Sequence, residues 1–252
     1  MVRRAKREVT VTITGNREET KPARQLPWII EFYRSDVAKK WAMALSGIIL
    51  LGYIAAHMLG NMKVYLGPTA INDYGEALRD LGGHLVPRTH LLWIMRAGLT
   101  AAFAIHIHAA YVLTRRNMRA RGKIRYDAPR QYLAADYASR TMRYSGVIVL
   151  LFLVFHLMDL TWGTVNPDFI RGDVYHNMVA SFDRLPVAIV YIAANLALGL
   201  HILHGVWSLF QSIGANNPVY NRWRRYLAWG FTAVIVAGNL SFPIAVQLGI
   251  IH

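Results

Sequence analysis

Residues 41–62 read WAMALSGIILLGYIAAHMLGNM, and this stretch decides the fold. It contains no Lys, Arg, Asp or Glu, and at 1.5 Å of rise per residue it is long enough to cross a hydrocarbon layer of roughly 30 Å as one helix. Four more apolar runs, each with at most one such charged residue, follow at 91–114, 144–163, 186–212 and 226–251. We therefore expect an all-α integral membrane protein with five transmembrane helices.

The composition agrees with this fold class and limits the chemistry. Of the 252 residues, 54% are hydrophobic, which is more than an ordinary soluble domain of this size carries. Cysteine is absent, which excludes disulfides, thiolate-held iron–sulfur clusters and covalently attached c-type haem. Any redox centre in this chain must therefore be held by nitrogen or oxygen atoms.

The basic residues predict the orientation of the helices. Residues 1–40, 115–143 and 222–225 hold 22 of the 28 Lys and Arg, whereas the loops 64–90 and 164–185 hold four Arg mixed with acidic residues. By the positive-inside rule, the N-terminus is cytoplasmic and the C-terminus is outside. The net charge of +14 is thus explained by topology, and no nucleic-acid partner is predicted, because no nucleic-acid motif is present.

Two regions are predicted along the chain. Residues 1–37 form a cytoplasmic N-terminal arm with a β-like stretch at 9–14, and residues 38–252 form the five-helix transmembrane domain. In the long basic connection between helices two and three, we expect a surface amphipathic segment at 132–144.

Histidines inside the apolar runs mark the candidate functional site. An ionisable side chain in a membrane helix is costly unless it is paired, so it points to function. Six of the ten histidines lie in these runs: His57, His106, His108, His156, His201 and His204. Helices one to four each carry at least one of them, and helix five carries none. From the predicted orientation, His57 and His156 share an outer level, and His106 and His204 share an inner level. Two bis-histidine pairs at two depths are suited to two b-type haems in a four-helix core.

Two helices offer a spare histidine. His106 and His108 point about 200° apart, so they cannot face the same haem, whereas His201 and His204 lie on similar faces. His204 is favoured over His201 because it is nearer the inner level and precedes Gly205, which leaves space beside the ring. His201 would then lie near the ligand or a haem propionate. Zinc is the competing metal, but it requires three or four ligands at one point.

Other polar residues are candidates for the surroundings of the cofactors. Arg96 is a charge within the outer third of helix two, and a haem propionate or Asp159 is its expected partner. Further candidates near the propionates are Ser46, Tyr53, Trp41, Arg143 and Ser145. A quinone or proton-entry site just beyond the outer haem is predicted from Asn61, Tyr65, Asn72, Tyr74 and Glu76.

Four pieces of the sequence carry a family resemblance: SGIILLGYIAAHMLGN at 46–61, FAIH at 103–106, LFLVFHL at 151–157 and HILHGVWSLFQ at 201–211. With these pieces the chain resembles, over about residues 35–250, the single-chain dihaem cytochrome b anchor of succinate:quinone oxidoreductases, which comprise succinate dehydrogenases and fumarate reductases. The resemblance implies that His57 and His156 bind the distal haem, and His106 and His204 the proximal one. Some members carry a buried carboxylate two residues before the helix-four ligand, where this chain has Ile202, so a proton path through that helix is not implied.

The resemblance also implies partners and a location. A flavoprotein subunit would oxidise succinate, and an iron–sulfur subunit would pass electrons to this chain, which would reduce a quinone, usually menaquinone in dihaem members. The chain would lie in the bacterial cytoplasmic membrane. Two alternatives stay open at this point: a dihaem b subunit of another dehydrogenase, of the formate dehydrogenase or hydrogenase type, and a transporter with a histidine proton relay.

Overall fold

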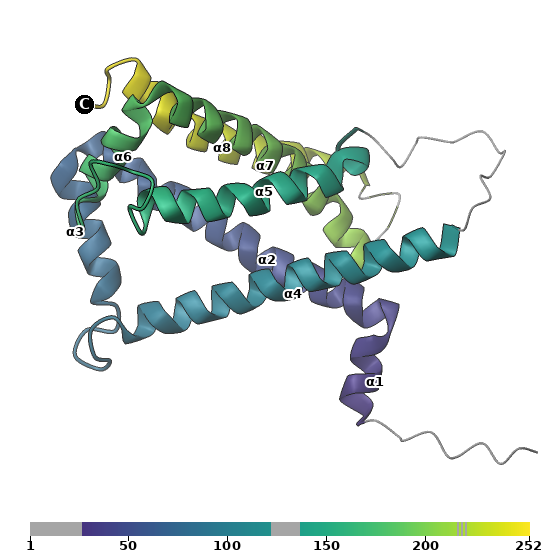
Figure 1. The fold of residues 1–252 in the computed structure, drawn as a ribbon. Helices are drawn as coiled ribbons and strands as arrows, with labels where there is room; N and C mark the ends of the chain where they lie inside the picture. The colour runs from purple at the N-terminus through teal and green to yellow at the C-terminus, as the bar shows by residue number, and fades with distance from the viewer. Residues whose placement is uncertain (1–26, 122–136, 216, 218, 220) are drawn as a thin grey trace, which may run out of the picture.

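The computed structural model describes residues 27–121, 137–215, 217, 219 and 221–252 (Figure 1). The β-like stretch at 9–14 and the first residues of the segment 132–144 lie outside the described residues. Five long helices run through the described part: α2 (Asp36–Asn61), α4 (His90–Arg121), α5 (Tyr137–Leu160), α7 (Leu185–Ser212) and α8 (Asn221–Gln247). Each is long and apolar enough to cross a membrane, so the five predicted helices are confirmed as candidate membrane spans.

The outer faces of the long helices are apolar. Ile49, Leu151 and Val234 are 55%, 65% and 61% exposed, and many other large hydrophobic side chains on these helices are similarly exposed. In water, so large an exposed apolar surface would be unfavourable, whereas lipid tails solvate it without cost. The fold class is therefore a bundle whose apolar side chains face lipid as well as one another.

Short helices lie at the two ends of the bundle (Figure 1). At one end, α1 (Trp28–Arg34) precedes α2; we call this the α1 end. At the opposite end lie the 3₁₀ helix η1 (Met62–Leu66), α3 (Pro68–Arg79), α6 (Val174–Asp183) and the C-terminus; we call this the α3/α6 end.

The predicted connections 64–90 and 164–185 each contain a short helix with a clear start signal. Gly67 takes the left-handed φ of 95° before Pro68, which opens α3 at its first position. The side chain of Asp173 caps α6 by accepting from the backbone N–H of His176. Asn72 of α3 also donates to Asp173 and accepts from two N–H groups in the first turn of α6. These hydrogen bonds, first the one from His176 and then the one from Asn72, lower the pKa of Asp173.

The long helices pack in two pairs, with α2 along α4 and α5 along α7. The helix without an apolar-run histidine, α8, packs along α7 and also touches α2. Gly238 of α8 permits this approach to α2, because a Cβ there would clash with the sulfur of Met58. The apolar cluster at this junction contains Met58, Ile202, Val206, Ala228 and Ile235. The four helices that carry the buried histidines thus form a core, and α8 supports it from one side.

Candidate cofactor site

The buried histidines form two facing pairs. The ring centres of His57 in α2 and His156 in α5 lie 5.9 Å apart, with an angle of 75° between the ring planes. The ring centres of His106 in α4 and His201 in α7 lie 6.3 Å apart, with an angle of 62°. Two imidazoles that bind one metal from opposite sides through bonds of about 2 Å have ring centres about 6 Å apart. Both pairs therefore have the spacing that two histidines would need to hold one metal between them.

The two pairs lie at different depths. Ser46 contacts His106 at 3.3 Å, and Ser145 lies 3.5 Å from the ring nitrogen of His201, so both serines mark the level of the second pair. On α2, His57 follows Ser46 by eleven residues, and on α5 His156 follows Ser145 by the same spacing. Eleven residues of helix rise about 16 Å. The His57–His156 pair thus lies toward the α3/α6 end, and the His106–His201 pair toward the α1 end.

A hydrogen-bond partner at Nδ1 orients each of the four rings. The Nδ1 atom of His106 lies 3.2 Å from the carbonyl oxygen of Met43, that of His156 lies 3.4 Å from the Tyr191 hydroxyl, and that of His201 lies 3.5 Å from the Ser145 hydroxyl. These oxygens can accept an Nδ1–H, which leaves Nε2 with its lone pair available for a metal. Three of the rings are therefore prepared to bind through Nε2. At His57 the partner is the side-chain NH2 group of Asn61, which donates to Nδ1 at 3.2 Å and so orients the ring without fixing the same tautomer.

A glycine adjoins each member of the His106–His201 pair. A Cβ on Gly47 would lie 3.6 Å from Cε1 of His106, and one on Gly146 would lie 3.3 Å from Cε1 of His201. Both glycines directly follow the serines that contact the same rings. The sequences SGIILLGYIAAH at 46–57 and SGVIVLLFLVFH at 145–156 thus repeat one arrangement in two helices. This internal repeat is a sequence signal that the sequence analysis missed.

At one position the structure differs from the sequence argument. The ring that faces His106 is that of His201, three residues before the favoured His204. The sequence argument estimated depth from the loop that follows α7, whereas α4 and α7 both start at the α3/α6 end, at His90 and at Leu185. Counted from those starts, His106 and His201 are each sixteen residues along, so they lie at the same level.

The second histidine of α4, His108, lies on a different face of that helix from His106. Its Nδ1 atom is 3.1 Å from the hydroxyl of Tyr33 in α1, and the two rings stack with centres 6.1 Å apart. His108 is therefore separated from the His106–His201 pair, as the angle of about 200° between the two positions predicts.

Two charged residues of the membrane helices, Arg96 and Asp159, have different partners. The rival partner proposed for Arg96, Asp159, is instead paired with Arg184 at 2.7 Å. The Arg96 guanidinium lies over the Trp93 ring, 5.0 Å from its centre, and no ion pair within the described residues involves it. Arg96 precedes His106 by ten residues, about 15 Å of helix rise toward the α3/α6 end, and the Tyr53 ring lies 5.4 Å from that of His57. Arg96 and Tyr53 thus provide hydrogen-bond donors beside the His57 level.

The remaining propionate candidates lie toward the α1 end. Ser46 and Ser145 are buried and donate to backbone carbonyls of the preceding turn, while their oxygens face the histidines. Arg143, two residues before Ser145, is exposed, and so is Trp41 at 45%.

The predicted quinone residues do not form one cluster. Asn61 contacts His57, and the Tyr74 ring lies so close to Gly60 that a Cβ there would clash with it. Tyr65 donates to Ser241 of α8 at 2.7 Å. Glu76 forms ion pairs with two arginines at the surface. Asn72 is used in capping α6. Of these residues, Asn61 and Tyr74 lie against the end of α2 that carries His57.

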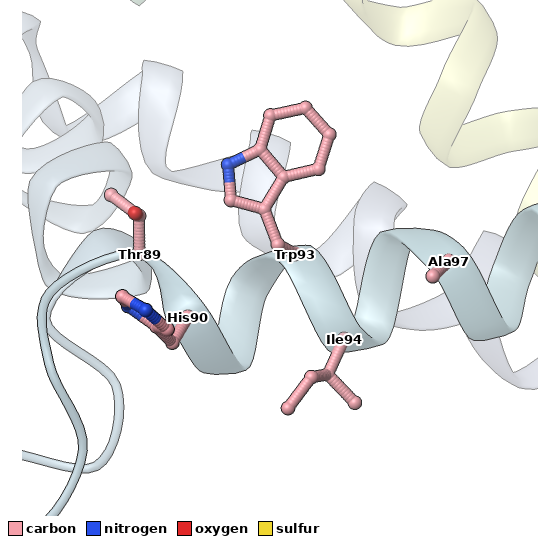
Figure 2. A pocket seen from close by; sticks show the side chains of 5 residues that line it. All are labelled: Thr89, His90, Trp93, Ile94 and Ala97. Carbon is pink, nitrogen blue, oxygen red and sulfur yellow. The ribbon is translucent and has the colours of Figure 1, made fainter.

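An open apolar pocket of about 530 Å³ lies at the start of α4 (Figure 2). Thr89, His90, Trp93, Ile94 and Ala97 line it, and Trp93 and Ile94 point to different sides of the helix. None of these residues belongs to the two histidine pairs or to the predicted quinone set. The pocket is therefore distinct from the site built by α2, α4, α5 and α7.

The comparison with known families identifies the chain. The model of the succinate dehydrogenase/fumarate reductase transmembrane subunit family matches residues 115–240, half of the chain. The chain belongs to this family. The match includes α5 and α7 with His156 and His201, whereas His57 and His106 precede it. Searches of curated proteins and of solved structures gave no match.

Membership assigns this chain to a complex. It is the membrane-anchor subunit of a succinate dehydrogenase or fumarate reductase, with five candidate membrane spans. Such a complex implies a flavoprotein and an iron–sulfur subunit as partners. The chain contains no cysteine that could hold an iron–sulfur cluster itself, which agrees with this division.

The two histidine pairs fit the cofactor that the family commonly binds, which is haem b. Across the described ranges, no three His, Asp or Glu side chains come together as a zinc site would require. A bis-histidine site requires only two ligands, with the right spacing and with Nε2 atoms available. Sequence reasoning missed Tyr191, which contacts Nδ1 of His156, and Ser181, which donates to Asp159, because neither is a charged residue in an apolar run.

Proposed function

We propose that this anchor subunit binds two haems b and passes electrons from succinate oxidation, through the iron–sulfur subunit, to menaquinone. The observation that supports this proposal best is the pair of facing histidine couples, with ring centres 5.9 and 6.3 Å apart and every Nδ1 atom hydrogen-bonded. When bound, each haem supplies a one-electron redox centre inside the membrane.

Each residue has a defined part in this proposal. His57 and His156 bind the distal haem, and His106 and His201 bind the proximal one. Met43, through its carbonyl, and Ser46 and Ser145, through their hydroxyls, fix the rings of the proximal pair. A ligand held in this way loses less conformational freedom on binding and keeps its tautomer.

Arg96 and Tyr53 are proposed to bind the propionates of the distal haem. Arg96 lacks a carboxylate partner among the described residues, and a buried or lipid-facing cation requires one. Arg143 is the corresponding candidate for the proximal haem, because it lies two residues before Ser145. His204 and His108 are not ligands in this proposal.

The proposed orientation places the α1 end in the cytoplasm, as the basic segments favour. Electrons from the iron–sulfur subunit then reach the proximal pair first and the distal pair second. The quinone site is proposed beside the distal pair, with Asn61 and Tyr74 as its first candidates and Tyr65 and Glu76 farther along the same segment.

The test is a haem count on the purified complex with matched histidine variants. We expect His201→Ala to lose one of two haems, whereas His204→Ala, one turn away in the same helix, retains both. His57→Ala should lose the other haem. Reduced-minus-oxidised spectra give the haem content per chain. Loss of a haem in His204→Ala with both retained in His201→Ala would overturn the ligand assignment.

The two alternative functions have less support. A b subunit of a formate dehydrogenase or hydrogenase type does not explain the match to the succinate dehydrogenase/fumarate reductase family. A histidine-relay transporter offers no reason for two facing pairs with the spacing of axial ligands.

A further inference from the structure

A buried carboxylate lies one turn beyond His156 on α5. Asp159 is 0% exposed in a helix that is long and apolar enough to cross a membrane, an environment in which an unpaired carboxylate is very costly. It is paired with Arg184 at 2.7 Å, and it accepts hydrogen bonds from the hydroxyls of Ser181 and Tyr191. The proposed electron-transfer path assigns no part to this carboxylate.

Tyr191 connects Asp159 to the haem ligand. Its hydroxyl donates to Asp159 at 2.9 Å and lies 3.4 Å from Nδ1 of His156. Because the hydroxyl hydrogen is given to the carboxylate, the hydroxyl oxygen can accept the Nδ1–H of His156. Tyr191 is 4% exposed, and its ring packs against Phe152 and Phe182, so the hydroxyl is held in place.

The other three ligands have neutral partners at Nδ1. His106 faces a backbone carbonyl and His201 a serine hydroxyl, whereas the Nδ1 atom of His57 accepts from the side-chain NH2 group of Asn61. Among the hydrogen bonds recorded for the described residues, only those of His156 lead to an anion, and they do so through one intervening hydroxyl. The two pairs therefore differ in electrostatics although their ring spacings are similar.

We propose that Tyr191 and Asp159 are positioning residues that make His156 the most electron-donating of the four ligands and so lower the reduction potential of the haem it binds. This inference rests on the proposed function, because it requires the His57–His156 haem. An acceptor on Nδ1–H that is polarised by a carboxylate raises the basicity of the imidazole, and a more basic ligand stabilises the oxidised iron. Arg184 supplies the opposite charge that keeps the carboxylate tolerable in this apolar setting.

The test is Tyr191→Phe in the purified complex. Phenylalanine keeps the ring packing and leaves the Asp159–Arg184 pair intact, but it removes the hydroxyl between Asp159 and His156. We expect both haems to be retained and the potential of one to rise, with about a tenfold change in its reduction equilibrium, which is about 59 mV for one electron. The other haem should not shift. Tyr175→Phe is the matched control, since Tyr175 donates to the carbonyl of His252 at the same end of the bundle and should leave both potentials unchanged.

Two further measurements separate the outcomes. The haem that remains in His57→Ala identifies the potential of the proximal pair, so the shifted haem can be assigned. Asp159→Asn should shift the same haem in the same direction, which keeps the test decisive if Tyr191→Phe loses a haem. Potentials that stay unchanged in both variants with two haems present, or a shift of the proximal haem instead, would overturn the inference. A wild-type complex without haem would overturn the proposed function itself.

Discussion

The Asp159–Arg184 pair yields a stability prediction that needs no cofactor. Arg184→Met removes the cation beside a carboxylate that is 0% exposed. Removing one partner of a buried ion pair costs about 3–5 kcal/mol, because the remaining charge is left uncompensated. Among the described residues, the hydroxyls of Ser181 and Tyr191 remain as donors to the carboxylate, so we expect a cost within this range.

Removing the carboxylate instead of the cation should cost less stability. In Asp159→Asn the Arg184 side chain remains 28% exposed and still donates to the carbonyls of Ala180 and Val165. The new amide can also accept from Tyr191. We therefore expect a loss of about 1–2 kcal/mol, which is the usual cost of weakened hydrogen bonds at a buried site.

Unfolding of the purified complex in detergent measures both costs. Arg184→Met should unfold under clearly milder conditions than Asp159→Asn, and the double variant Arg184→Met with Asp159→Leu should recover much of the loss, because it removes both charges. Equal destabilisation by the two single changes, together with additive costs in the double variant, would refute the reasoning that a buried charge dominates here.

Three other predictions concern separate parts of the molecule. Gly60→Ala should destabilise the complex by about 1–3 kcal/mol in thermal unfolding, because its Cβ would meet a tyrosine ring of α3 at 2.6 Å, whereas Gly52→Ala, with open space around it, should be neutral. Asp173→Ala should cost about 1 kcal/mol at neutral pH through loss of the α6 cap. Because the pKa of Asp173 is lowered in the folded state, its contribution is present above the ordinary pKa of about 3.9 and is lost as the pH falls through the lowered value; thermal unfolding between neutral and acidic pH should show this component in the wild type and not in the variant. In the cysteine-free chain, an impermeant thiol reagent should label Leu85→Cys from outside intact cells and Ala215→Cys only after permeabilisation; the opposite pattern would reverse the orientation.

The membrane helices could be predicted from the sequence because a helix that crosses lipid must be long and apolar. A span needs about 20 apolar residues, and each of the five runs meets that length. Histidine in such a run is costly, so His57, His106 and His156 stood out, and the structure brings each into a facing pair.

The choice between His201 and His204 required the place where α7 begins. Helix ends estimated from sequence are uncertain by about two to four residues. A difference of three residues, which is about 4.5 Å along the helix and about 60° around it, lies within that uncertainty. The short helices α3 and α6 were missed for another reason. Each mixes polar and apolar residues, so neither stands out as an apolar run.

The network around His156 could not be predicted from one sequence. Asp159, Ser181, Arg184 and Tyr191 come from α5, α6, the α6–α7 junction and α7, and only the fold brings them together. The sequence offered Asp159 as a partner for Arg96, and nothing in it identified Arg184 as the partner that the fold provides.

The haem b content of the purified complex tests the central claim most directly. The account predicts two haems per chain in the wild type, one in His57→Ala and one in His201→Ala. It predicts none in the variant that carries both changes, with the helical content retained. A wild-type complex that contains no haem, or a double variant that still contains two, would contradict it.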